Sequence, residues 1–91
     1  MTRFLWDADK EAENIFKHGV DFETAQLAFQ DPGRHIRYDL AHSREEKRFF
    51  CVGNIAGKVL TVRFTYRENG IRIIGAGYWR KGKKIYEKKK N

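Results

Sequence analysis

The spacing of hydrophobic residues differs between the two halves of the chain. Over residues 8–18 apolar side chains recur at every third or fourth position, which predicts an amphipathic helix. Asp7 has the side chain of an N-cap, and Gly19 suits the left-handed position that ends a helix. A second stripe of the same period continues to residue 29 behind Asp21, another capping residue. The N-terminal third therefore predicts a helical hairpin.

Later in the chain apolar and polar positions alternate, which is the period of strands with one buried face. Strands are predicted at residues 36–40, 48–56, 58–67 and 71–79, after a short first strand at residues 3–6. Glu68-Asn69-Gly70 carries a strong hairpin signal, and the basic segment from Arg80 predicts a last helix. This order indicates one α+β domain over residues 1–91: a small antiparallel sheet packed by an N-terminal helical hairpin and a basic C-terminal helix.

The longest predicted strand, residues 58–67, has two chemically different faces. One face is apolar and belongs in the core, and the other carries Thr61, Arg63, Thr65 and Arg67. Strict alternation on the next strand groups a second set of side chains, Arg72, Ile74, Ala76 and Tyr78. Gly75 and Gly77 fall on the opposite side. Glycine in a strand allows the close approach of another backbone or a bulge, and here we expect the two glycines to make room for a helix. A sheet face with arginines and rings suits a phosphate backbone with stacked bases, and a solvated charged face is the alternative.

Composition narrows the class of protein. With 91 residues, 41% of them hydrophobic and 14% aromatic, the chain can build one small core. No apolar run approaches the roughly 20 residues that span a bilayer, and the N-terminus has no signal-peptide pattern. We therefore expect a soluble, cytoplasmic protein. Cys51 is the only cysteine, which excludes an internal disulfide and a thiolate metal cluster.

The formal charge of +7 is distributed unevenly along the chain. Residues 1–31 hold three basic and seven acidic side chains, residues 32–70 hold eight and four, and residues 71–91 hold eight and one. The three segments therefore carry −4, +4 and +7. A basic chain favours a polyanionic partner, either nucleic acid or an anionic membrane surface. The basic C-terminal segment lacks a broad apolar face, which disfavours the membrane.

Three histidines, His18, His35 and His42, have side chains that ordinarily titrate near neutrality. A metal-independent ribonuclease needs a base for the 2′-hydroxyl, an acid for the leaving 5′-oxygen and cations for the phosphate. His18 ends the first predicted helix, and His42 lies in a loop ahead of Arg48. Capping a helix or a turn is the alternative for any one of them. Their spacing matches no metal site, so we expect neither a metal nor another cofactor.

Four motifs follow one another along the chain: Phe4-x-Trp6-Asp7-x-x-Lys10, Asn14-x-x-Lys17-His18-Gly19-Val20-x-Phe22-x-x-Ala25, His42-Ser43-x-x-Glu46-x-Arg48-Phe49 and Ile71-Arg72-Ile73-Ile74-x-Ala76. In this combination the chain resembles the BrnT family over essentially its whole length. The resemblance implies a compact fold similar to RelE-type ribonucleases. It also implies a toxin of a type II toxin–antitoxin pair, which cleaves RNA and arrests translation. Its implied partner is a BrnA-like, DNA-binding antitoxin that neutralises the toxin and represses the operon.

The resemblance also bears on the site. RelE-type enzymes tend to use arginines, lysines and a tyrosine, and many BrnT members have serine and arginine where this chain has Gly75 and Gly77. By face and residue type, the candidate catalytic residues are Lys17, His18, His42, Arg48, Arg72 and Arg80. The candidate RNA-binding residues are Arg63, Arg67, Tyr78, Lys83, Lys84 and Tyr86. The expected partners are the antitoxin and RNA, either free mRNA or mRNA on a ribosome. We expect the toxin to contact operator DNA only through the antitoxin, and we expect no membrane partner.

Two other functions stay open on the sequence alone. No sharp catalytic spacing is present, which is compatible with a non-catalytic module that only binds RNA or DNA. The changed segment at residues 75–77 is compatible with a decayed toxin that only binds its antitoxin. Both alternatives keep the basic surface and differ from the ribonuclease in having no chemistry.

Overall fold

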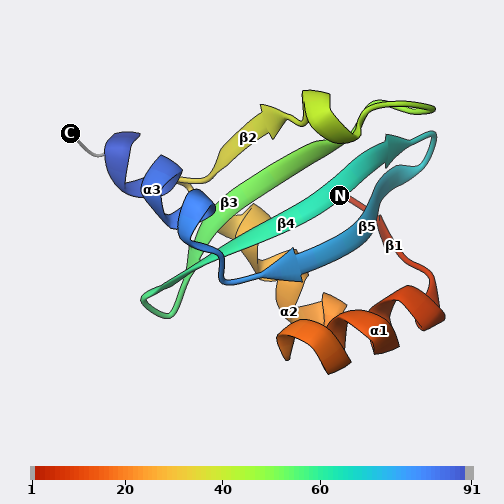
Figure 1. The fold of residues 1–91 in the computed structure, drawn as a ribbon, viewed down its shortest axis with the longest axis horizontal. Helices are drawn as coiled ribbons and strands as arrows, with labels where there is room; N and C mark the ends of the chain where they lie inside the picture. The colour runs from red at the N-terminus through yellow and green to blue at the C-terminus, as the bar shows by residue number, and fades with distance from the viewer. Residues whose placement is uncertain (1, 90–91) are drawn as a thin grey trace.

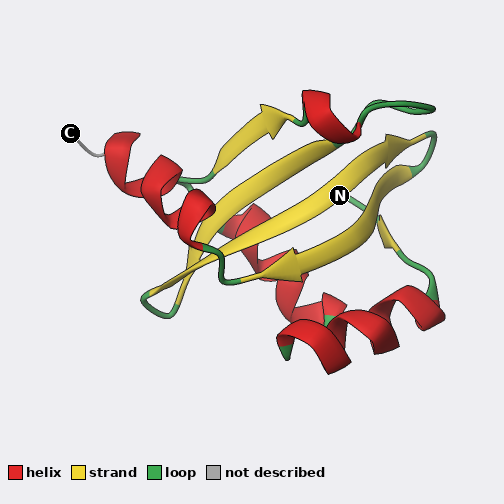
Figure 2. Cartoon of the chain, viewed as in Figure 1, coloured by secondary structure: helices red, strands yellow, loops and turns green. Residues whose placement is uncertain are grey.

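Helices cover both faces of a five-stranded sheet in the computed structural model, which describes residues 2–89 (Figure 1). The strands are β1 (Phe4–Leu5), β2 (His35–Tyr38), β3 (Phe49–Ile55), β4 (Lys58–Arg67) and β5 (Gly70–Gly77). The helices are α1 (Ala8–His18), α2 (Phe22–Gln26) and α3 (Arg80–Lys89), with 3-10 turns η1 (Leu27–Gln30) and η2 (Leu40–His42) (Figure 2). The predicted α+β class is confirmed. The last two residues of the basic tail lie outside the described range.

The sheet is mixed rather than purely antiparallel. Its strand order is β1-β5-β4-β3-β2, with β1 parallel to β5 and every other neighbouring pair antiparallel. The Ile71 amide donates to the Arg3 carbonyl at 2.8 Å where the parallel pair begins. Local turn signals predict the hairpins between β3, β4 and β5. The partner of β1 lies at the far end of the chain, and no local signal specifies it.

Capping residues fix the two N-terminal helices as predicted. The side chains of Asp7 and Asp21 accept backbone amides of the first turn of α1 and α2 at 2.9 and 2.7 Å. The amide that donates to Asp21 lowers the pKa of its carboxyl. Gly19 ends α1 in the left-handed region, at φ 69°. The second helix is shorter than predicted because its last turn tightens into η1, where buried Ala28 packs against Gly53 of β3.

α2 and η1 lie on one face of the sheet and α3 on the other (Figure 1). The first face holds the core, where Phe29 of η1 packs edge-on against Phe64 of β4 with ring centroids 5.0 Å apart. The opposite face, called the α3 face below, carries Thr61 and Arg63 of β4. Gly82 of α3 packs directly on the Thr61 hydroxyl, where a Cβ would collide. The face that the sequence predicts as open is therefore covered in part by α3.

A β-bulge breaks the alternation predicted for β5. Arg63 pairs with Gly75, but the next residue of β4 pairs two positions earlier in β5, which leaves Ile74 as an extra residue. Ala76 consequently faces the core, where it is fully buried. Gly75 shares the α3 face with Arg72, from which strict alternation separated it. The predicted grouping of these side chains is wrong because a period of two cannot pass through a bulge.

Asn14 joins α1 to the edge of β5 by replacing a neighbouring strand. Its buried amide donates to the Ala76 carbonyl at 2.9 Å and accepts from the Ala76 amide at 3.1 Å. The same amide nitrogen donates to the Val20 carbonyl at 2.9 Å, so both of its donor hydrogens are used. These bonds hold the last turn of α1, with Lys17 and His18, beside the sheet.

Candidate active site

Three hollows meet at Trp79, between the end of β5 and the start of α3. The cationic hollow, about 180 Å³ in volume, is lined among others by Lys10, Lys17, His18 and Arg63. The apolar hollow, about 280 Å³, is lined among others by His42, Phe50, Arg63, Lys81 and Ile85. The hairpin hollow, about 660 Å³, is lined among others by Lys58, Tyr78, Arg80 and Lys83. Trp79 lines all three, and Arg63 lines the first two.

The Trp79 indole is fixed by the residues around it. It lies over Gly77, where a Cβ would collide with the ring. The His18 ring meets it edge-on, with centroids 5.1 Å apart and planes at 88°. The prediction that Gly77 makes room for a helix is wrong, because this indole takes the space. Gly75 does face a helix, since its Cβ position lies 3.5 Å from Asn14 Oδ1 of α1.

The cationic hollow gathers positive side chains that are distant in sequence. Lys17 and His18 come from the end of α1, and Arg63 comes from the middle of β4. All three are candidates from the sequence, and the structure adds Lys10. Lys17 Nζ lies 3.2 Å from Glu13 Oε1, but both side chains are more than half exposed. Such a pair is weak, so the lysine stays available to an anion. A concave surface with several cations attracts a phosphate.

His42 reaches the apolar hollow from η2, and Asp39 orients its ring. His42 Nδ1 lies 2.9 Å from Asp39 Oδ2. An ionised carboxylate only accepts, so the hydrogen is on Nδ1 and Nε2 is the acceptor of the neutral ring. The Ser43 hydroxyl holds the turn, since it donates to the Asp39 carbonyl at 2.6 Å and accepts from the Arg48 amide at 2.8 Å. Sequence reasoning missed Asp39, whose only signal is its spacing of three residues from His42.

Arg48 shares a further hollow of about 390 Å³ with His42, where Glu46 engages its guanidinium. Arg48 Nε lies 3.4 Å from one Glu46 carboxylate oxygen, as an ion pair without hydrogen-bond geometry. Arg67 Nη2 lies 3.2 Å from the other oxygen. One carboxylate therefore offsets part of the positive charge of both arginines. Arg48 lines this hollow together with His42, and Arg67 does not.

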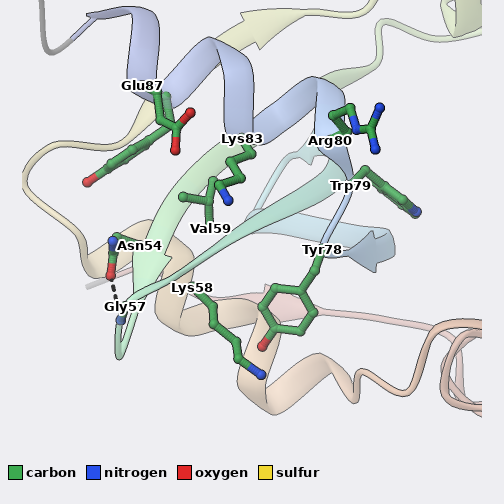
Figure 3. Close-up of a pocket in the computed structure, with 10 residues that line it drawn as sticks. Asn54, Gly57, Lys58, Val59, Tyr78, Trp79, Arg80, Lys83 and Glu87 are labelled. Carbon is green, nitrogen blue, oxygen red and sulfur yellow. Dashed lines mark hydrogen bonds between the residues drawn. The ribbon is translucent and has the colours of Figure 1, made fainter.

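Three of the predicted residues near the start of α3 occupy the hairpin hollow. Tyr78, Arg80 and Lys83 line it (Figure 3). Lys58, which sequence reasoning overlooked, places Nζ 5.7 Å from the centre of the Tyr78 ring. None of the residues that line this hollow is a histidine. Its cations and the Tyr78 ring suit contact with a phosphate backbone.

The other predicted residues are not brought together. Arg67, Arg72 and Lys84 line none of these hollows. Tyr86 adjoins the hairpin hollow but is only 7% exposed, and its hydroxyl donates to Asp31 Oδ2 at 2.6 Å. This hydrogen bond raises the pKa of Tyr86. The contact docks α3 onto the turn after η1, which makes Tyr86 a structural residue.

Comparison with protein families identifies the kind of domain that carries these hollows. A family model described as the ribonuclease toxin, BrnT, of type II toxin–antitoxin systems matches residues 6–82. The chain belongs to the BrnT family. No curated protein matches it. The family that the four sequence motifs predicted is therefore confirmed, and the matched range includes every cationic-hollow residue named above.

Membership of the BrnT family indicates a ribonuclease toxin with an antitoxin partner and an RNA substrate. Cys51 is a poor nucleophile for such chemistry, because burial raises the pKa of its thiol to about 12. Within residues 2–89, no three or more His, Cys, Asp and Glu side chains group where they could hold a metal ion. No helix in that range is long and apolar enough to cross a membrane.

Proposed function

We propose that this BrnT-family chain is an endoribonuclease that cleaves RNA by attack of a 2′-oxygen on the adjacent phosphorus. A base removes the 2′-hydroxyl proton as the new O–P bond forms. The bond from phosphorus to the 5′-oxygen breaks, and an acid protonates that oxygen, which leaves a 2′,3′-cyclic phosphate and a 5′-hydroxyl. The step needs proton-transfer groups on two sides of one phosphate, and cations that stabilise its added charge.

The position of Arg63 is the observation that carries this proposal. Arg63 lines two hollows, with His42 in one and Lys17 and His18 in the other. A phosphate on its guanidinium therefore lies beside two hollows, each of which contains a histidine. We assign His42 as the base, because Asp39 leaves its Nε2 free to accept a proton. His18 or Lys17 then protonates the leaving oxygen.

The proposed mechanism needs no metal ion. Lysines and arginines take the part that a divalent cation plays in other nucleases, which is to stabilise the charge on phosphorus and the leaving oxygen. Lys10, Lys17, Arg63 and Lys81 line the two hollows around the proposed phosphate position. Their combined positive charge favours the binding of an anion and disfavours the binding of a metal cation at the same place. Arg80, Tyr78 and Lys83 hold the RNA backbone further along, in the hairpin hollow.

The proposal includes a neutralising partner. We expect a BrnA-like antitoxin that presents acidic side chains to the cationic hollow, because carboxylates there imitate the phosphates of RNA. Such an antitoxin binds operator DNA on behalf of the pair. Without it, cleavage of mRNA in the cytoplasm, free or on a ribosome, inhibits translation.

Cleavage of defined substrates by the purified protein tests this function. Cutting is expected to survive EDTA, to leave a 2′,3′-cyclic phosphate, and to fail on RNA with 2′-deoxyribose at the cut position. His42→Ala is expected to lower the rate by about 10²–10⁴, and whichever of His18→Ala and Lys17→Ala gives a loss of the same size identifies the acid. Lys84→Ala, at an exposed position of α3 away from the hollows, is the matched control. Cleavage of the deoxy substrate contradicts the mechanism, and tight RNA binding without any cutting favours a non-catalytic module.

A further inference from the structure

The apolar hollow has a chemistry that the cleavage step by itself does not require. Its lining includes the rings of Phe50 and Trp79 and the side chain of Ile85. It also includes the cations Arg63 and Lys81, and His42 with its partner Asp39. Its volume of about 280 Å³ lies at the lower end of the range for small-molecule sites. A largely apolar cavity of this size that is also lined by two cations matches a flat ring system that bears a negative group.

The walls of this hollow are held in place by the fold. Trp79 is clamped between Gly77 and the edge of the His18 ring. Gly82 sits directly on Thr61, which fixes the start of α3 against the sheet. A cavity built on clamped residues needs little reordering when it is filled, so binding loses little conformational entropy.

The hollow also stands in a defined relation to the proposed phosphate position. Arg63 and Trp79 separate it from the cationic hollow and line both. A nucleotide with its phosphate on Arg63 can therefore place its base among Phe50, Trp79 and Ile85, while the RNA strand continues past Lys17. An apolar side chain of a protein would fill the same walls but would leave Arg63 and Lys81 without an anion.

We infer that the apolar hollow binds one unpaired nucleobase of the RNA, stacked against Phe50 or Trp79, with the attached phosphate on Arg63. This inference rests on the proposed function and narrows its substrate class to single-stranded RNA. A base in a duplex is stacked and paired, so it must leave the helix to enter the hollow. The hollow then adds affinity at one position of the RNA, as stacking on aromatic side chains does elsewhere.

Binding of an RNA that cannot be cut separates this inference from the cleavage mechanism. The probe is a short single-stranded oligonucleotide in which fluorine replaces every 2′-hydroxyl, with one abasic position moved along its length. Ala41→Phe adds a ring to the lining of the apolar hollow, where Ala41 is an exposed residue. Ala12→Phe introduces the same ring at an exposed position of α1 away from the hollows.

In the unmodified protein and in Ala12→Phe, loss of one particular base is expected to weaken binding about 5- to 150-fold. In Ala41→Phe the base-containing and abasic oligonucleotides are expected to bind equally. Equal binding of all abasic variants by the unmodified protein overturns the inference. The inference is also overturned if Ala41→Phe still binds the base-containing oligonucleotide more tightly than the abasic one. It is overturned as well if Ala41→Phe loses antitoxin binding while its RNA binding is unchanged. If ordinary RNA is cleaved but no abasic position weakens binding, the proposed function stands and the base site is overturned. If an abasic position weakens binding but ordinary RNA is not cleaved, the base site stands and the proposed function is overturned.

Discussion

At the scale of single residues, the roles of side chains come from their contacts. The Asp39 side chain is only 14% exposed, and its carboxylate lies 2.9 Å from His42 Nδ1. The Ser43 hydroxyl holds the backbone of this turn by donating to the Asp39 carbonyl. Gly77 is a comparable case, because its missing side chain gives the Trp79 indole a place to lie. In both cases a neighbouring residue decides where a ring of the candidate site lies.

Asp39→Asn tests the positioning role at this scale. The amide can donate to Nδ1 as well as accept, so the ring loses the fixed acceptor at Nε2. The turnover rate for RNA cleavage is expected to fall about 10- to 100-fold, with KM nearly unchanged and a changed pH–rate profile. In a His42→Ala background the same change is expected to have no further effect, because Asp39 acts through His42. A further loss in that background contradicts this role.

At the scale of elements, the docking of α3 shapes the α3 face. Gly82 lies on Thr61 at one end of the contact, and Tyr86 bonds to Asp31 at the other. The Asp31 carboxylate also accepts the amides of Gly33 and Asn54, at 2.8 and 2.7 Å. One carboxylate thus links α3, the turn after η1 and β3. The hollows on either side of α3 depend on these few contacts.

Gly82→Ala tests the close packing of α3. Alanine favours an isolated helix by about 1 kcal/mol, but its Cβ would collide with the Thr61 hydroxyl. We expect the free energy of unfolding to fall by about 1–3 kcal/mol in denaturant titrations. Thr61→Ala removes the colliding hydroxyl, so the double variant is expected to recover most of the loss relative to Thr61→Ala alone. A stabilised Gly82→Ala protein would show that helix propensity outweighs packing here.

The Tyr86 hydrogen bond predicts a dependence of stability on pH. The bond to Asp31 raises the pKa of Tyr86 in the folded state, so the folded protein holds this proton more tightly than the unfolded one. The stabilisation is complete below the ordinary tyrosine pKa of about 10 and is lost as pH rises through the folded value. Between about pH 8 and pH 11, Tyr86→Phe is expected to show a smaller drop in Tm than the unmodified protein. Tyr66→Phe, at a half-exposed ring, is the control and is expected to keep the full drop.

At the scale of the whole molecule, folding redistributes the charge. The N-terminal segment carries a net −4, yet it supplies Lys10 and Lys17 to the cationic hollow. Arg63 comes from the middle segment, and Lys81, at the apolar hollow, comes from the basic tail. The charge of each segment therefore does not locate the cationic surface. Affinity for RNA is expected to depend on these four residues more than on the total of +7.

The salt dependence of RNA binding checks this distribution. For single-stranded nucleic acid, each neutralised phosphate contributes about 0.7 to the slope of log K against log salt. Lys81→Gln, in the apolar hollow, is expected to lower that slope by about this amount for an RNA that cannot be cut. Lys84→Gln removes the same charge from α3 outside the hollows and is expected to change it much less. Equal effects of the two variants would mean that only total charge matters.

Much of the fold follows from local patterns in the sequence. The caps at Asp7 and Asp21 and the strand from Lys58 to Arg67 are found where spacing and turn chemistry place them. Residue type and face name Lys17, His18, His42 and Arg63 as candidates for a site, but they do not say which of these residues meet. Trp79 was not among the candidates, because nothing near it in sequence distinguishes a ring that lines several hollows from a ring in the core.

The sequence by itself determined the element types, the caps, the hairpins and the family, because each depends on residues within a few positions or on an ordered set of motifs. Only the tertiary structure decided the parallel pairing of β1, the bulge at Ile74, and the meeting of three hollows at Trp79. These features depend on contacts between distant parts of the chain, such as the bonds from Asn14 to Ala76. Packing and backbone hydrogen bonding select such contacts among many that local propensity allows equally.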